Sequence, residues 1–123
     1  MILSVWSMTK SVHRPIHIDL ARLLVDMNET EKYGYYHATN EGGYISWYDF
    51  TKEIYRQAGY NTKVTPVTTA EYGLSKAVRP FNSRLDKSKL TENGFKPLPV
   101  WTDAVHRYLE ILKKQGFFDE LNK

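Results

Sequence analysis

The residues best suited to binding a charged ligand lie in one basic segment, residues 75–89. Arg79 precedes a proline, which restricts its backbone, and its planar guanidinium can donate two parallel hydrogen bonds to phosphate oxygens. Asn82 and Ser83 follow it closely and add neutral hydrogen-bonding groups. The segment therefore predicts a diphosphate-binding site made by Arg79, Asn82 and Ser83.

The composition of this segment also permits a plainer interpretation. Its local charge is +4, larger than the net charge of +3 of the whole chain, because a single acid, Asp86, accompanies five basic residues. These are Lys76, Arg79, Arg84, Lys87 and Lys89. Solvated charges beside a capped helix would give the same pattern, and composition alone favours that reading. A small basic nucleic-acid binder is a less favoured alternative, which the many aromatic residues allow.

Motifs for catalysis or cofactor binding are absent from the sequence. It contains no glycine-rich dinucleotide motif, no P-loop and no G-x-S-x-G. The pair Gly42-Gly43 is interpreted as a turn before a helix. Tyr48 and Lys52 have the Tyr-x-x-x-Lys spacing of a reductase, but nine tyrosines make a chance match easy. The four histidines lack metal-binding spacing. We expect no catalytic, cofactor-binding or metal-binding residues in this chain.

The composition places the chain among ordinary globular proteins. Its 123 residues suit one small domain, and the absence of cysteine excludes a disulfide framework. No apolar run is long enough to cross a membrane, and the first residues are too short for a signal-peptide core. We therefore expect a cytoplasmic protein.

Apolar spacing predicts three longer helices: residues 19–27, residues 46–58, and a last helix from Pro99 or Val100 to Gln115. Ser46 with Asp49 resembles a capping box, and Gly59 is expected to end the second helix. The residues of the last helix expected to face inward are Trp101, Val105, Tyr108, Leu109 and Leu112.

Shorter elements fill the rest of the chain. Short helices are expected to start near Thr68 and after Asp86, and strands are expected at residues 35–39 and 63–67. The predicted fold class is α+β, with about four helices and two or three short strands. Such a thin sheet would be more stable if its strand at residues 35–39 paired with a larger sheet.

Several motifs, in order, resemble the C-terminal part of dTDP-4-dehydrorhamnose reductases, which are extended short-chain dehydrogenase/reductases. The segments that carry the resemblance are residues 33–42 (YGYYHATNEG), 46–50 (SWYDF), 64–72 (VTPVTTAEY), 79–85 (RPFNSRL), 93–95 (NGF) and 98–101 (LPVW). The resemblance covers roughly residues 14–115. Because it rests on ordered motifs, it is more specific than any single match.

The resemblance implies a division of labour. Family members reduce dTDP-4-dehydro-L-rhamnose with NADPH, and an N-terminal Rossmann sheet with a Tyr/Lys pair, which this chain lacks, would carry the cofactor and the chemistry. Residues 14–118 would form the sugar-nucleotide-binding domain, with Arg79 on the diphosphate and residues 1–13 and 119–123 as tails. The chain would be inactive alone, would bind a dTDP-sugar weakly, and would self-associate through a face left uncovered. A non-catalytic regulatory or binding module of the same fold is the alternative.

Overall fold

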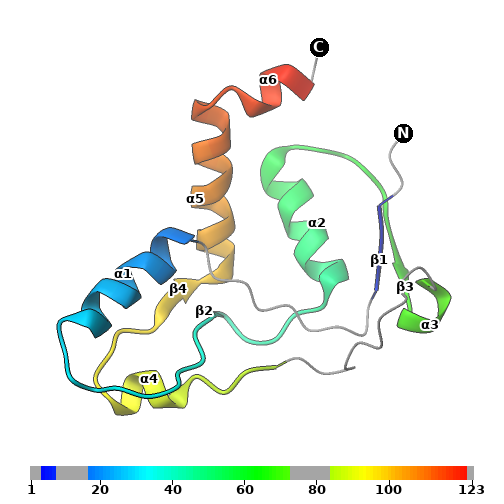
Figure 1. The fold of residues 1–123 in the computed structure, drawn as a ribbon. Helices are drawn as coiled ribbons and strands as arrows, with labels where there is room; N and C mark the ends of the chain where they lie inside the picture. The colour runs from blue at the N-terminus through cyan, green and yellow to red at the C-terminus, as the bar shows by residue number, and fades with distance from the viewer. Residues whose placement is uncertain (1–3, 8–16, 73–83, 122–123) are drawn as a thin grey trace. The chain divides into compact units, whose positions relative to one another are not determined.

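The chain folds into two compact units, each built from two separate stretches of sequence. The computed structural model describes residues 4–7, 17–72 and 84–121. Unit 1 contains residues 1–13 and 43–84, and unit 2 contains residues 14–42 and 85–123. The described residues form six helices and four short strands, labelled in Figure 1. This content confirms the α+β class, with more short elements than the sequence predicted.

Unit 1 is a helix packed on a pair of parallel strands. Strand β1 (Ser4–Ser7) pairs with β3 (Val64–Val67), so that Ser4 lies opposite Val64 and Ser7 opposite Val67. Helix α2 (Trp47–Ala58) contacts both strands, and the short α3 (Thr69–Tyr72) contacts β1. The helix thus covers a sheet too small to be stable by itself.

The two helices of unit 1 begin as the sequence predicts. Ser46 Oγ accepts a hydrogen bond from the Asp49 amide at 3.1 Å and donates to its carboxylate at 2.7 Å. Gly59, with a φ of 80°, ends α2 in the left-handed conformation. At α3, the Thr68 amide donates to the Glu71 carboxylate at 2.7 Å, and the Glu71 amide donates to Thr68 Oγ1 at 3.2 Å. Both helix starts are therefore capped by a side chain, and α3 has the reciprocal bonds of a capping box.

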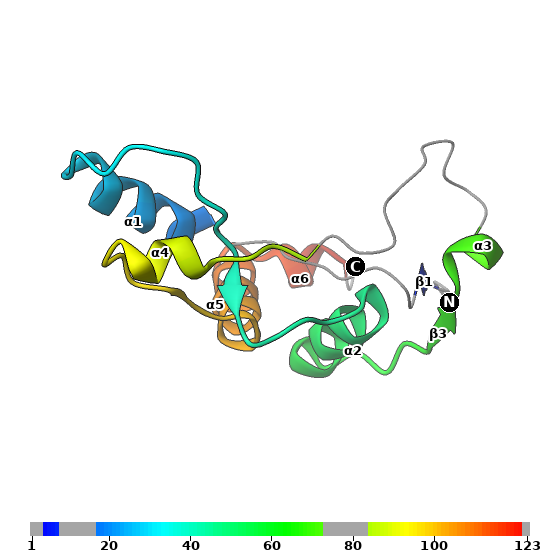
Figure 2. The same ribbon diagram turned by 90° about the horizontal axis from the view of Figure 1, so that it is seen from below.

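Unit 2 contains the other four helices and a second strand pair. Its elements are α1 (His17–Asn28), β2 (Asn40–Glu41), α4 (Ser88–Glu92), β4 (Leu98–Val100), α5 (Trp101–Lys114) and α6 (Phe117–Leu121). β2 and β4 are parallel. Leu23 of α1 and Leu90 of α4 belong to the core of the unit, and both helices are labelled in Figure 2. The helices predicted at residues 19–27, after Asp86 and before Gln115 are confirmed.

The core of unit 2 joins α1, α4 and the chain that leads into β4. Leu23, Leu90, Phe95 and Leu98 are 7% exposed or less, and Met27, Tyr36 and Ala38 pack against them. The rings of Tyr36 and Phe95 meet edge to face, with centroids 5.7 Å apart. Burying each such leucine or phenylalanine contributes about 1.5–3 kcal/mol. This core fixes the frame on which the polar residues of unit 2 lie.

The strand predicted at residues 35–39 is wrong. The ladder with β4 begins only at Asn40, and residues 35–39 are not in a strand. Side-chain contacts hold this segment instead: Lys89 Nζ donates to the Tyr35 carbonyl at 2.9 Å, and Tyr36 packs on the core. Aromatic and β-branched residues between turns indicate an extended chain, but they do not show whether a strand partner exists.

Other expectations are corrected at the ends of the chain. Residues 4–7 form β1, although residues 1–13 were expected to be a tail, and residues 119–121 belong to α6. Residues 14–118, expected to form one sugar-nucleotide-binding domain, include parts of both units, and that domain assignment stays a prediction. Tyr108 was expected to face inward but is 50% exposed. None of the described helices is both long and apolar enough to cross a membrane.

Candidate functional site

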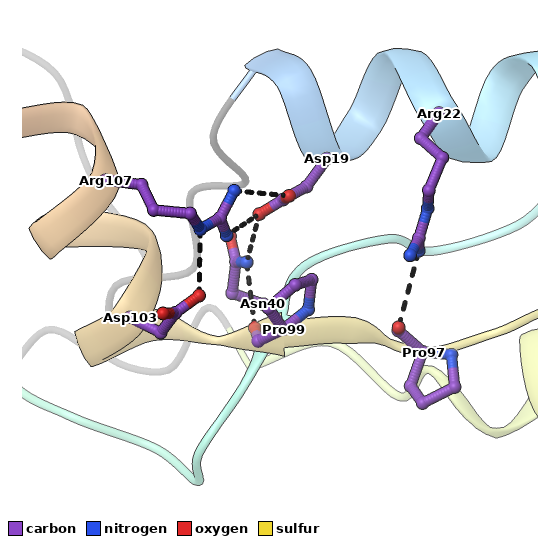
Figure 3. Close-up of polar contacts among 7 residues, drawn as sticks. All are labelled: Asp19, Arg22, Asn40, Pro97, Pro99, Asp103 and Arg107. Carbon is purple, nitrogen blue, oxygen red and sulfur yellow. Dashed lines mark hydrogen bonds and ion pairs between the residues drawn. The ribbon is translucent and has the colours of Figure 1, made fainter. Parts of the chain in front are cut away.

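An ion pair between a buried aspartate and a half-buried arginine joins the first helix of unit 2 to its longest helix. Asp19 lies in the first turn of α1 and is only 5% exposed. Arg107 of α5 donates to both of its carboxylate oxygens, from Nη1 to Oδ1 at 2.9 Å and from Nη2 to Oδ2 at 2.8 Å (Figure 3). Two parallel bonds between planar groups fix orientation as well as distance. The pair therefore holds α1 and α5 in one geometry.

Two more side chains complete this arrangement, which we call the polar network (Asp19, Asn40, Asp103 and Arg107). Asn40 of β2 donates from Nδ2 to Asp19 Oδ2 at 3.1 Å and to the Pro99 carbonyl at 2.9 Å. Arg107 Nε donates to Asp103, one turn earlier on α5, at 2.8 Å. Figure 3 shows these groups converging between α1, α5 and β4. The network links two helices and both strands of unit 2.

Asp19 and Arg107, the ion pair of the polar network, both carry their charge at neutral pH. Burial raises the pKa of the Asp19 carboxyl, but hydrogen bonds from Arg107 and Asn40 outweigh it, so that its pKa lies below the ordinary value. The hydrogen bond to Asp19 raises the pKa of Arg107 above its already high value. A general acid or base needs a pKa near the working pH. The polar network is thus suited to holding the fold together and not to proton transfer.

Part of the basic segment also serves the fold. Lys87 Nζ donates to the Asn40 carbonyl at 3.1 Å and lies 3.2 Å from Glu41 Oε1. Lys89 Nζ donates to the Tyr35 carbonyl. These two ammonium groups fasten residues 35–41 to the start of α4. Two of the five basic residues are therefore held within unit 2, which weakens the nucleic-acid interpretation of the segment.

The predicted ligand-binding residues Arg79, Asn82 and Ser83 lie outside the described residues. The next residue, Arg84, is described, and its guanidinium carbon lies 4.6 Å from the centre of the Tyr44 ring in unit 1. This distance is that of a cation–π contact. The two ends of the basic segment therefore differ. Arg79, Asn82 and Ser83 are predicted from sequence to bind a ligand, whereas Lys87 and Lys89 make hydrogen bonds within unit 2.

The glycine pair does not form a cradle for a dinucleotide. A Cβ on Gly42 would lie 2.7 Å from Trp101 Cδ1 and 2.9 Å from Val100 Cγ1. Packing against the start of α5 therefore accounts for this glycine. The sequence also contains no glycine-rich strand-to-helix motif, so Gly42 and Gly43 do not belong to a dinucleotide-binding turn of that kind.

The Tyr-x-x-x-Lys spacing on α2 has a structural explanation as well. Lys52 Nζ lies 5.0 Å from the centre of the Tyr48 ring. An ammonium over the ring face makes a cation–π contact, which is a common contact on helix surfaces. Within the described part of the chain, no three His, Asp or Glu side chains are grouped so that they could hold a metal ion.

The polar network was missed by sequence reasoning. Asp19 was expected only as an acid at a helix start, which is a common and exposed position. The one available signal was the spacing of Asp103 and Arg107, four apart on a predicted helix, but such pairs are frequent on helix surfaces. Burial of an aspartate becomes visible only when α1 and α5 are placed in space.

Comparison with known proteins gives a consistent result over most of the chain. Residues 14–114 match the model of the RmlD substrate binding domain family. The spore coat polysaccharide biosynthesis protein SpsK of Bacillus subtilis is 39% identical over 77 residues, 63% of this chain and 26% of that protein. The dTDP-4-dehydrorhamnose reductase of Shigella flexneri is 36% identical over 94 residues, 72% of this chain and 31% of that protein.

Solved structures agree with the sequence comparison. A dTDP-4-dehydrorhamnose reductase from Clostridium acetobutylicum has a TM-score of 0.83 at 31% identity, over 89% of this chain and 39% of that one. The enzyme of the same name from Bacillus anthracis, solved in complex with NADP, has a TM-score of 0.78 at 28% identity and is covered to 37%. The chain therefore spans between about a quarter and two fifths of the length of these relatives.

Proposed function

This chain belongs to the RmlD substrate binding domain family, and we propose that it is the substrate-binding portion of a dTDP-4-dehydrorhamnose reductase. The observation that supports the proposal most strongly is the extent of the match. It takes in residues 14–114 of this chain, whereas the chain covers only 31% of the Shigella flexneri reductase and 39% of the Clostridium acetobutylicum enzyme. The matched family is itself described as a substrate-binding domain.

The ligand of this portion is a dTDP-sugar of the rhamnose type. Arg79 supplies the main positive charge for the diphosphate, because a guanidinium fork matches phosphate oxygens, and Asn82 and Ser83 contribute neutral hydrogen bonds. Binding by this chain alone is weak, since the cofactor-side half of a reductase pocket is not part of it. The protein works in the cytoplasm, a location that its lack of cysteine fits.

Hydride transfer is not a property of this chain alone. The reaction of the family draws its hydride from NADPH, and this sequence contains no glycine-rich dinucleotide-binding turn. Asp19 and Arg107 of the polar network do not exchange a proton near neutral pH. The purified chain is therefore expected to leave NADPH unoxidised when it is mixed with dTDP-4-dehydro-L-rhamnose.

Calorimetric titration of the full chain with dTDP-L-rhamnose tests the proposal. We expect saturable binding that is absent with GDP-mannose and is weakened about tenfold or more by Arg79→Ala, since a charge-assisted hydrogen bond to phosphate is removed. Arg56→Ala is the matched control, because Arg56 is paired with Glu53 on α2. Failure to bind dTDP-L-rhamnose, or equal binding by both variants, would contradict the proposal. Turnover of NADPH by the pure chain would contradict the division of labour.

Two other functions would give different results in the same preparations. A regulatory module of the same fold would co-purify with a stable protein partner and bind no nucleotide sugar. A nucleic-acid binder would retain DNA or RNA at low salt and release it as salt rises.

A further inference from the structure

Four exposed residues form one stripe along the outer side of α1 and the turn that follows it. Ile18, Arg22, Val25 and Glu29 follow one another at intervals of four, three and four residues, which places them on one face of a helix. Ile18 and Val25 are 57% and 59% exposed, and Arg22 and Glu29 are exposed as well. The Glu29 amide donates to the Val25 carbonyl at 3.3 Å, so the helical path extends to Glu29. We call these four residues the α1 stripe.

The core of unit 2 leaves the α1 stripe uncovered. The buried side of the helix is carried by Asp19 and Leu23, which are 5% and 1% exposed. Intervals of four and three residues are those of the seam between two packed helices. The α1 stripe therefore has the spacing of a helix–helix contact, and it lies on the side of α1 that faces solvent.

The two charged residues of the α1 stripe can still take an ionic partner. Among the described residues, Arg22 forms no salt bridge, and its printed hydrogen bond is a long one, from Nη2 to the Pro97 carbonyl at 3.5 Å. Glu29 forms no salt bridge in that part of the chain either. A guanidinium and a carboxylate that share an exposed face are each suited to a partner of opposite charge.

The charges of the α1 stripe match a reversed copy of the same stripe. Arg22 and Glu29 lie seven residues apart, about two helical turns, with Val25 between them. If a second α1 runs antiparallel about a two-fold axis beside Val25, Arg22 of each copy meets Glu29 of the other. A parallel pair would place like charges opposite each other, which is destabilising. Charge complementarity thus selects a second copy of this chain and its direction.

We propose that the chain forms a two-fold dimer in which the α1 stripes of two copies pack antiparallel. Ile18 and Val25 supply the apolar contact, and the ion pairs between Arg22 and Glu29, one in each direction, set the register. Because each copy contributes one helix, the contact is smaller than a standard interface, and the dimer is weak and depends on concentration. The inference does not rest on the proposed function, since it uses no residue assigned to the ligand.

Charge reversal tests the pairing, with sedimentation of the full chain over a concentration series as the measurement. Arg22→Glu turns both ion pairs into facing carboxylates, and Glu29→Arg turns both into facing guanidinium groups. We expect each variant to weaken the dimer about tenfold, since two attractive pairs become repulsive. Lys96→Glu is the control, because it changes the net charge as Arg22→Glu does at an exposed residue outside the α1 stripe. It should associate as the wild type does.

A mixture of the two reversal variants gives the sharpest result. When one Arg22→Glu chain pairs with one Glu29→Arg chain, each carboxylate again faces a guanidinium, so the mixture should associate about as strongly as the wild type. The combined variant, with both substitutions in one chain, should recover for the same reason. A mixture of Lys96→Glu with Glu29→Arg carries the same net charges but keeps one repulsive pair, so it should associate more weakly.

Folding and association are measured separately in every variant. Because the substituted residues are exposed, each variant should unfold at about the same urea concentration as the wild type. Recovery in the mixture and in the combined variant supports the antiparallel α1 contact. A wild type that stays monomeric at all concentrations overturns the dimer. Unchanged association of both reversal variants, or no association in the mixture of folded variants, overturns the proposed contact.

Discussion

Two arginines of this chain, Arg107 and Arg84, are held by different kinds of contact: carboxylates in unit 2 and an aromatic ring in unit 1. Arg107 is 33% exposed and donates to the buried Asp19 and to Asp103, so its donors are spent inside unit 2. Arg84 is exposed and lies against the Tyr44 ring in unit 1. A cation–π contact at an exposed place restrains a guanidinium by only about 0.5–1 kcal/mol.

The difference teaches how a local excess of positive charge should be read. The segment at residues 75–89 looks uniform in sequence, but Lys87 and Lys89 bind carbonyls of residues 35–41. Removal of a cation that is bonded within the fold should lower the free energy of unfolding. The ligand affinity of the protein that still folds should stay unchanged. Removal of a cation that contacts the ligand should weaken ligand binding and leave the free energy of unfolding unchanged.

The largest expected effect comes from Arg107→Ala. Without Arg107, Asp19 keeps its charge in a place that is 5% exposed, and a buried charge without its partner is strongly destabilising. Because Arg107 is itself partly exposed, we expect a loss of about 2–3 kcal/mol in the free energy of unfolding, measured by urea denaturation. Lys113→Ala is the control, since its pair with Glu110 lies on the surface and should contribute less than about 0.5 kcal/mol. Equal losses of unfolding free energy in Arg107→Ala and Lys113→Ala would contradict a larger contribution from the pair with the buried Asp19.

Acid should remove the same interaction gradually. A carboxylate whose folded-state pKa is lowered stabilises the protein above its unfolded-state pKa, and that stability is lost as pH falls through the folded-state value. For Asp19 this places the loss below about pH 4. Glu53, whose pKa its hydrogen bond with Arg56 lowers to about 2, contributes in a similar range. Asp19→Asn isolates the first contribution: its unfolding free energy should fall less steeply below pH 4 than that of the wild type. If the unfolding free energy of Asp19→Asn fell as steeply below pH 4 as that of the wild type, Asp19 would not contribute to the acid sensitivity of the fold.

A smaller loss is expected from Asn40→Ala. Asn40 donates to Asp19 and to the Pro99 carbonyl, so the substitution removes two hydrogen bonds near buried acceptors. We expect a loss of about 1–2 kcal/mol in the free energy of unfolding. The exposed Asn61→Ala should change it by less than about 0.5 kcal/mol. If Asn40→Ala were as stable as Asn61→Ala, the polar network would reduce to the ion pair alone.

The weakest effect concerns the outer side of α1. Its inner side carries Asp19 and Leu23, whereas Ile18, Leu24 and Val25 are 57%, 55% and 59% exposed. Exposed apolar groups that share a helix favour association. We expect the apparent mass in sedimentation experiments to rise with concentration, and Val25→Gln to reduce that rise. Tyr33→Gln, at a residue that is 86% exposed but outside α1, is the control. A monodisperse monomer at all concentrations would contradict the expectation.

Local elements of the fold could be predicted because their signals are local. Ser46 with Asp49, Gly59, and Thr68 with Glu71 mark helix ends through bonds between residues at most four positions apart. The family could be recognised because several motifs occur in order. By contrast, the pairing of β1 with β3 joins residues 60 positions apart, and nothing in either segment specifies the partner.

The polar network could not be predicted for the same reason. The Asp19–Arg107 contact spans 88 positions, and each residue alone resembles an ordinary surface charge. Arg79, Asn82 and Ser83 remain predictions from sequence and resemblance. The Arg84–Tyr44 contact became visible only when residues 44 and 84 were brought together in unit 1.

Titration of the isotope-labelled chain with dTDP, followed by amide chemical shifts, tests the central claim most directly, because it reports on Arg79 and Arg107 at once. The account predicts saturable shifts at Arg79, Asn82 and Ser83, with the amides of Asp19, Asn40 and Arg107 unmoved. Absence of saturable shifts at Arg79, Asn82 and Ser83, or shifts concentrated on the polar network, would contradict it.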